Sequence, residues 1–175
     1  MKSTIKIPDG VQVSVQRKKV TVKGKKGELT RQFVCPTIKI EVAGDQVIVT
    51  CESARKAKKA TVGTIAAHVK NMIIGVTNGY KYSLRAVYAH FPMVCKVQGS
   101  KFLIDNFLGE KYPRKTNVPA GVEIKISGQD LTVLGLNKEA VGIAASRIEQ
   151  LTKLKTRDRR VFQDGIYLTK RELAE

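Results

Sequence analysis

The segment PDGVQVSVQRKKVTVKG at residues 8–24 is matched without a gap by PAGVEIKISGQDLTVLG at residues 119–135. Six positions are identical, and the apolar positions alternate in the same way in both segments. A second match, at a different offset, aligns residues 62–69 with residues 141–148. Because self-similarity over a long period is typical of duplicated units, the chain is predicted to contain two copies of one fold.

Each copy is predicted to consist of a strand pair followed by a helix. The two offsets, 111 and 79, differ by 32 residues, so the first copy is expected to carry an additional segment between these elements. Alternating apolar residues at 38–42 and 47–49, with a turn at Gly44 and Asp45, predict a second hairpin that fills this segment.

Two helices are predicted from apolar residues that recur at steps of three and four. In the first helix, Ser53 is the expected N-cap and Gly75 the expected end; in the second, Asn137 is the expected N-cap. The expected apolar faces are Val62, Ile65, Ala66, Val69, Met72 and Ile73 in the first helix, and Val141, Ala144, Ala145, Ile148 and Leu151 in the second.

Further strands are predicted between the two copies, at residues 80–87, 94–97, 102–104 and 111–116. They are expected to complete the second sheet. The predicted fold class is therefore α+β, with two duplicated small domains, each a mostly antiparallel sheet packed on one helix. The expected domains are an N-terminal repeat at residues 1–78 and a C-terminal repeat with a basic extension at residues 79–175.

Positive charge dominates both halves of the chain. The formal net charge is +17; residues 1–79 carry 15 lysines and arginines against 5 carboxylates, and residues 80–175 carry 17 against 10. Such a field destabilises an isolated fold through self-repulsion, so a polyanion, by default a nucleic acid, is expected to neutralise it. A solubilising surface is the alternative, although such surfaces usually mix both signs.

Few residues point to a metal, a cofactor or catalysis. The three cysteines, Cys35, Cys51 and Cys95, form no CxxC pair, which is typical of a reduced intracellular protein. His68 is expected to flank the core, and His90 to contact backbone or phosphate from a turn. No apolar run reaches transmembrane length. We therefore expect a cytosolic chain that is not an enzyme and has no cofactor, metal, membrane or small-molecule partner.

Three basic clusters in the first domain are candidate RNA contacts. They are Arg17, Lys18 and Lys19 at the first hairpin tip, Lys25 and Lys26 in a GxxG turn, and Arg55, Lys56, Lys58 and Lys59 at the start of the first helix. A helix dipole disfavours cations at its N-terminus, so a docked phosphate backbone would explain the last cluster; a solvated lysine face is the alternative. The GxxG turn joins two strand-like runs, which argues against the helix-joining clamp of KH domains.

The segment after the second helix interleaves cations with aromatic residues. The candidates here are Lys153, Lys155, Arg157, Arg159, Arg160, Phe162 and Tyr167. Arginine forks bind phosphates bidentately, and aromatic or guanidinium planes stack on unpaired bases. A basic helix C-terminus that favours its dipole, with Phe162 buried, is the alternative.

Four blocks of the sequence resemble the universal large-subunit ribosomal protein six family, called protein nine in eukaryotes. They are residues 22–29, residues 75–82 followed by residues 87–92, residues 106–112 with the sequence NFLGEKY, and residues 159–167. Together they span essentially the whole chain. The closing block resembles the archaeal and eukaryotic branch, and the absence of tryptophan favours an archaeal member.

The resemblance implies ribosomal RNA binding near the factor-binding side of the large subunit, in the cytoplasm. It also implies neighbouring ribosomal proteins as partners, with translation factors as further candidates. Carried over by position, it implies that the second domain contacts RNA through residues 153–160 and through the turn that contains Lys111, Arg114 and Lys115. The alignment of the copies places Arg17–Lys19 opposite residues 128–130, so the second copy is expected to lack a basic hairpin tip. A free-standing RNA- or DNA-binding regulator is the alternative function.

Overall fold

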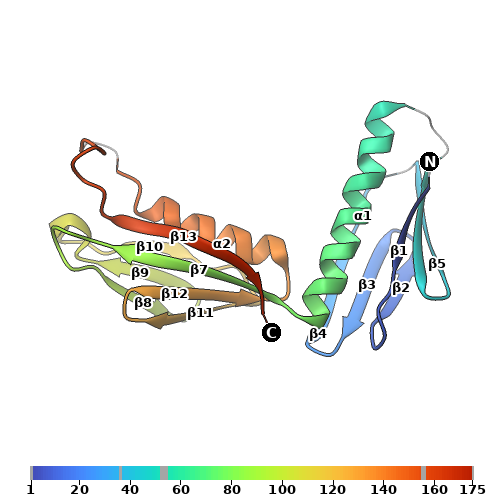
Figure 1. Cartoon of the computed structure of the whole chain (residues 1–175), viewed down its shortest axis with the longest axis horizontal. Helices are drawn as coiled ribbons and strands as arrows, with labels where there is room; N and C mark the ends of the chain where they lie inside the picture. Colours follow the sequence, from blue (N-terminus) through green and yellow to red (C-terminus); the bar gives the residue numbers. More distant parts are fainter. Residues whose placement is uncertain (1, 36, 52–54, 155–156, 175) are drawn as a thin grey trace. The chain divides into compact units, whose positions relative to one another are not determined.

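The computed structural model describes the whole chain except residues 1, 36, 52–54, 155–156 and 175. Its contacts divide the chain into two compact units, Met1–Gly79 and Tyr80–Glu175, called here the N-terminal and the C-terminal unit. In each unit one α-helix packs against antiparallel strands (Figure 1). The predicted α+β class with duplicated units is therefore confirmed.

Six strands and one helix make up the described part of the N-terminal unit. They are β1 (Lys2–Lys6), β2 (Gln12–Gln16), β3 (Lys19–Gly24), β4 (Gly27–Gln32), β5 (Ile38–Ala43), β6 (Gln46–Cys51) and α1 (Lys56–Thr77). The strands form two antiparallel sheets, in the orders β1-β6-β5 and β2-β3-β4. Helix α1 contacts strands of both sheets.

The helix and the two sheets of the N-terminal unit share one core. Val20 and Val22 of β3 are fully buried, as are Val47 and Val49 of β6, and Val62 of α1 packs with them. The period of two along the strands and of three to four along the helix places these side chains between the same layers. Each buried valine contributes about 1.5–3 kcal/mol relative to an exposed one.

Seven strands, one helix and a single 3-10 turn make up the described part of the C-terminal unit. They are β7 (Tyr80–Val87), β8 (Val94–Gln98), β9 (Lys101–Asp105), η1 (Phe107–Gly109), β10 (Arg114–Asn117), β11 (Val122–Ser127), β12 (Asp130–Gly135), α2 (Lys138–Leu151) and β13 (Gly165–Leu173). The sheet orders are β11-β12-β7-β13 and β10-β9-β8, and every pairing is antiparallel. Helix α2 contacts strands of both sheets.

The predicted helices form with the expected buried faces. In α2 the Asn137 side chain accepts a hydrogen bond from the Glu139 backbone N–H at 2.9 Å, so the predicted N-cap is confirmed. Helix α1 starts at Lys56 with Arg55 as N-cap, whereas the predicted cap Ser53 lies outside the described residues. All predicted apolar positions are buried except Leu151, which is half-buried.

Strands β8, β9 and β10 do not complete the sheet that contains β7, contrary to expectation. Both edges of β7 are already paired, one with β12 and the other with β13, so the three strands form a sheet of their own. Strand β13 is absent from the sequence prediction because only its first two residues are buried, which leaves no apolar alternation to find.

The topology also corrects the alignment of the two copies. Each unit has one strand (β1 or β7), a three-stranded meander (β2–β4 or β8–β10), a hairpin (β5–β6 or β11–β12) and a helix. Residues 119–135 therefore correspond to the hairpin β5–β6, not to residues 8–24. Gly44 (φ 56°) and Gly128 (φ 60°) occupy the same turn of the two hairpins. The described part of the first copy thus contains no strand or helix beyond those that the second copy also has.

Candidate nucleic-acid interface

The turn between β2 and β3 displays the first predicted cluster. Arg17, Lys18 and Lys19 are all exposed, and Arg17 has a left-handed φ of 56°. The equivalent turn of the C-terminal unit, between β8 and β9, has Gly99 at φ 57° followed by Ser100. The expected match with residues 128–130 is therefore wrong, because those residues lie in and beside the β11–β12 turn. The equivalent β8–β9 turn is neutral at Gly99 and Ser100 but keeps one exposed cation, Lys101, at the position of Lys19.

Arginine at the left-handed position of this turn should reduce the stability of the N-terminal unit. Because a non-glycine residue at this φ costs about 1 kcal/mol, Arg17→Gly is expected to raise the free energy of unfolding by up to about that amount. The same change should weaken RNA binding. Hydrogen exchange of the β2 and β3 amides in the full chain measures the first effect.

The neighbouring position provides the matched control for this prediction. Lys18 has no positive φ, so Lys18→Gly should lower the stability through glycine's larger loss of backbone entropy on folding. Faster exchange in Arg17→Gly than in the wild type would contradict the argument from strain.

The GxxG element is a hairpin turn, as predicted. Gly24 pairs with Gly27 across the end of β3 and β4, and Lys25 and Lys26 form the turn. Lys26 is directed at the end of α1: its Nζ donates to the Asn78 carbonyl at 2.6 Å and its backbone N–H donates to the Val76 carbonyl at 3.1 Å. A cation is favoured at a helix C-terminus, so Lys26 has a structural role.

The start of α1 exposes cations without any acidic residue in the first turn. Arg55, Lys56 and Lys59 are exposed, and Lys58 is half-buried. The charge is therefore accessible from solvent, as the predicted phosphate contact requires. Phosphate binding at this position stays a prediction.

In the C-terminal unit, a buried carboxylate joins two loops that are far apart in the sequence. The Asp164 side chain is only 3% exposed. It accepts hydrogen bonds from the backbone N–H groups of Ala89 and His90, both at 3.2 Å, and pairs with Nδ1 of His90 at 3.0 Å. Burial acts to raise the pKa of Asp164, but the hydrogen bonds from His90 and Ala89 outweigh it and the pKa is lowered.

The predicted stacking residue Phe162 contacts protein groups. Its ring centroid lies 4.7 Å from that of His90, and the Arg157 guanidinium lies 4.8 Å from it. Phe162 is half-buried and Arg157 is exposed. The Phe162 ring therefore packs against the exposed Arg157 and orients its guanidinium on the loop.

Arg114 is a clamp between the turn that follows β9 and the end of α2. Its guanidinium makes two hydrogen bonds to the Glu110 carboxylate, at 2.6 and 2.8 Å, and lies 4.3 Å from the Phe107 ring centroid. It also donates to the carbonyls of Leu151 at 2.7 Å and Lys153 at 3.3 Å. The pKa of Glu110 is lowered, chiefly by the Arg114 hydrogen bonds, with burial opposing and the charges of Arg114 and Arg157 assisting.

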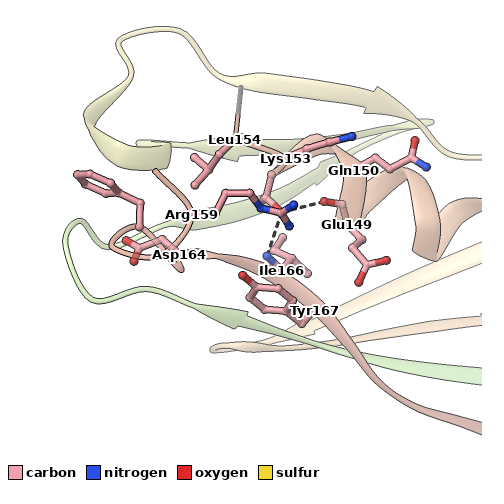
Figure 2. Close-up of a pocket in the computed structure, with 10 residues that line it drawn as sticks. Glu149, Gln150, Lys153, Leu154, Arg159, Asp164, Ile166 and Tyr167 are labelled. Atoms are coloured by element: carbon pink, nitrogen blue, oxygen red, sulfur yellow. Dashed lines mark hydrogen bonds between the residues drawn. The ribbon is translucent and has the colours of Figure 1, made fainter. Parts of the chain in front are cut away.

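A groove lies between the end of α2 and the segment that leads into β13 (Figure 2). Its volume is about 350 Å³, and Arg159 extends into it. Thr152 joins the end of α2 to the start of β13: its hydroxyl donates to the Glu149 carbonyl at 2.9 Å and accepts from the Ile166 N–H at 3.0 Å. The Tyr167 hydroxyl donates to the Gln163 carbonyl at 2.8 Å. The groove is therefore lined by both polar and apolar side chains, and hydrogen bonds hold the backbone around it.

The structure brings most of the predicted cations of the C-terminal unit onto its loops. The exposed ones are Lys111, Lys115, Lys153, Arg157, Arg159 and Arg160. Lys155 lies outside the described residues. Arg114 is only 24% exposed and is bound to protein groups, so it positions the turn rather than offering charge.

Two features of this interface are missing from the sequence predictions. Asp164 was not a candidate because its partners lie 74 and 75 residues away. Tyr112 is 85% exposed beside Lys111. Tyr112 is the last residue of the NFLGEKY block and lies between Lys111 and Pro113, but neither feature shows from sequence that its ring is exposed.

The described residues contain no group of three or more potential metal ligands. Burial, assisted by the charge of Asp105, raises the pKa of the Cys95 thiol to about 11, so this thiol is protonated at neutral pH.

Neither described helix combines the length and the apolar character that crossing a bilayer requires. His68 lies 6.2 Å from the Phe33 ring centroid, beside the core as expected.

Comparison with known proteins identifies the family. The family model for ribosomal protein L6 matches residues 7–79 and 91–165, one segment in each unit. This chain belongs to that family. Three similar archaeal proteins are each named large ribosomal subunit protein uL6. They come from Methanosarcina mazei (51% identity; 96% of this chain and 96% of the relative), Methanobrevibacter smithii (45%; 98% and 97%) and Methanospirillum hungatei (46%; 95% and 95%).

Family membership confirms the resemblance found in the sequence, including its archaeal character. It also confirms that the chain is a structural ribosomal component rather than an enzyme. The L6 match covers both repeats, so the duplicated architecture is shared by the family.

Proposed function

We propose that this chain, a structural constituent of the large ribosomal subunit in the cytoplasm, binds the RNA of that subunit through phosphate and shape contacts. Its further partners are neighbouring ribosomal proteins. The proposed location, near the factor-binding side of the subunit, is inferred from the family resemblance, and it makes translation factors candidate partners.

One observation carries the RNA-binding proposal: exposed cations lie on turns whose backbones are fixed by internal contacts. In the N-terminal unit the turn at Arg17 closes a regular antiparallel pair. In the C-terminal unit the loop that carries Arg157 is held by Phe162 and Asp164. A turn whose backbone is already fixed loses little backbone entropy when its cations meet phosphates, so such turns favour shape-selective binding.

The mechanism is electrostatic and needs no chemical turnover. Each cation that neutralises a phosphate releases condensed counterions, so the affinity falls as salt rises. Phosphate contacts fix position and orientation but carry little sequence information. The protein would therefore hold RNA helices in one relative arrangement.

Sedimentation and footprinting test this proposal. The chain is expected to pellet with large subunits at low salt and to dissociate as salt is raised. Chemical footprinting should show protected riboses on large-subunit RNA only when the protein is bound. A chain that stays in the soluble fraction while the subunits pellet would favour a free-standing nucleic-acid-binding regulator.

A further inference from the structure

Tyr112 is an aromatic side chain displayed on the outside of the C-terminal unit. It is 85% exposed, whereas Phe91 and Tyr167 are each 43% exposed. Among the described residues it makes no hydrogen bond or ring contact. One exposed aromatic ring is common on a protein surface, so a partner for Tyr112 is indicated only by the way its turn is held and charged.

The chain on the N-terminal side of Tyr112 is held in an unusual conformation. Asn106 and Leu108 have φ values of 58° and 51°, which non-glycine residues rarely adopt. The Asn106 side chain donates to the Pro92 carbonyl at 3.0 Å, and Leu108 is 5% exposed. Such strain persists only where the surroundings determine the conformation, and it is concentrated at functional sites.

The chain on the C-terminal side is held by the Arg114 clamp. The hydrogen bonds from Arg114 to Glu110, Leu151 and Lys153 fix the position of the turn relative to α2. Lys111, Tyr112 and Pro113 are the exposed residues between these anchors. The backbone of the turn is therefore held in place on both sides of Tyr112, while the Tyr112 ring stays exposed to solvent.

The surroundings of Tyr112 favour a polyanion over a protein partner. Lys111 and Lys115 are exposed on the same turn and strand, and the charge of Arg157 acts on Glu110. A partner that stacks on the ring must also bring negative charge to these cations. A nucleotide supplies both, because its base stacks and its phosphate pairs with a cation.

We propose that Tyr112 stacks on an unpaired base of the RNA bound by the C-terminal unit. This inference rests on the proposed RNA-binding function and adds a base contact to its phosphate contacts. Because every base has a flat π-face, the contact selects for an unpaired nucleotide at one position more than for a particular base.

Full-length wild type and three variants, Tyr112→Ala, Tyr112→Leu and Tyr112→Phe, test the proposal. The probe is the large-subunit ribosomal RNA of the organism that encodes this chain, transcribed as overlapping fragments. Tyr112→Ala and Tyr112→Leu are expected to raise the Kd by roughly tenfold without changing its salt dependence, whereas Tyr112→Phe keeps the ring and should stay within about twofold. In wild type, ultraviolet crosslinking should join Tyr112 to an unpaired nucleotide.

The outcomes separate this inference from the proposed function. If the wild type binds no fragment, RNA binding itself fails. If the wild type binds and Tyr112→Ala binds equally well, stacking is wrong and the phosphate contacts stand. Equal losses for Tyr112→Phe and Tyr112→Ala would assign the effect to the hydroxyl, and loss of a neighbouring protein with RNA binding intact would assign the ring to a protein contact; either result overturns stacking.

Discussion

Replacing Arg157, Arg159 and Arg160 together by glutamine is expected to weaken binding to large-subunit ribosomal RNA by about 100-fold at about 0.1 M salt. All three residues are exposed on the loop before β13. If each neutralises one phosphate, the slope of log K against log salt should become shallower by about 2–3, since each contact contributes about 0.7–0.9. Filter binding over a series of salt concentrations measures the affinity and the slope together.

A variant with the same change in net charge provides the control. Arg85, Lys125 and Lys170 lie elsewhere in the C-terminal unit, and each pairs with a carboxylate. Changing these three to glutamine should alter the salt slope by much less, because their charge is already offset locally. Equal effects of the two triple variants would mean that net charge, not the loop, determines binding.

Filter binding with a second triple variant tests whether the two units bind RNA independently. Changing Arg17, Lys18 and Lys19 to glutamine removes the positive charge of the exposed β2–β3 turn in the N-terminal unit. If the two clusters contact separate parts of the RNA, the free-energy losses of the two triple variants should add within about 0.5 kcal/mol in the combined variant. A combined loss no larger than either single loss would contradict separate contacts.

Local patterns in the sequence were sufficient for most elements of the fold. Alternating apolar residues predicted β2, β3, β5 and β6 because each of these strands turns one face towards the core. The steps of three and four predicted both helix faces. Strand β13 has no such pattern, since residues beyond its first two are exposed or half-buried and its pairing with β7 is a tertiary event.

The relation between the two copies could not be read correctly from identity alone. Residues 8–24 and 119–135 match because both contain a glycine turn before alternating apolar residues, a pattern that hairpins in general require. Strand order distinguishes them: β3 is the centre of a three-stranded meander, whereas β12 pairs with β7 and precedes the helix directly. Only the pairing of distant strands carries that information.

The candidate site shows the same limit. Composition identifies cations but does not distinguish those bound to protein groups from those that face solvent. Lys26 donates to a helix C-terminus and Arg114 to a carboxylate and two carbonyls, although both appear in sequence beside exposed basic residues. The supporting residue Asp164 is invisible locally because its three hydrogen bonds all come from residues 89 and 90.

Asp164→Ala is expected to lower the stability of the C-terminal unit by about 3 kcal/mol, because two backbone N–H groups and one imidazole N–H would each lose their acceptor in a buried position. All five tyrosines of the chain lie in the C-terminal unit and there is no tryptophan, so the tyrosine band in the near-ultraviolet circular dichroism of the full chain follows this unit alone. Asp130→Ala is the matched control. Its carboxylate is 72% exposed and 3.9 Å from Arg85, so its loss should cost less than about 1 kcal/mol.

The pH dependence gives this prediction a second readout. The pKa of Asp164 is lowered in the folded chain, so its contribution to stability is present above the ordinary aspartate pKa of about 4 and is lost as the pH falls through the lower folded value. The difference in melting temperature between the wild type and Asp164→Ala should therefore be largest near neutral pH and should shrink below about pH 4. A difference that stays constant down to strongly acid pH would show that the ionised carboxylate does not hold the two loops together.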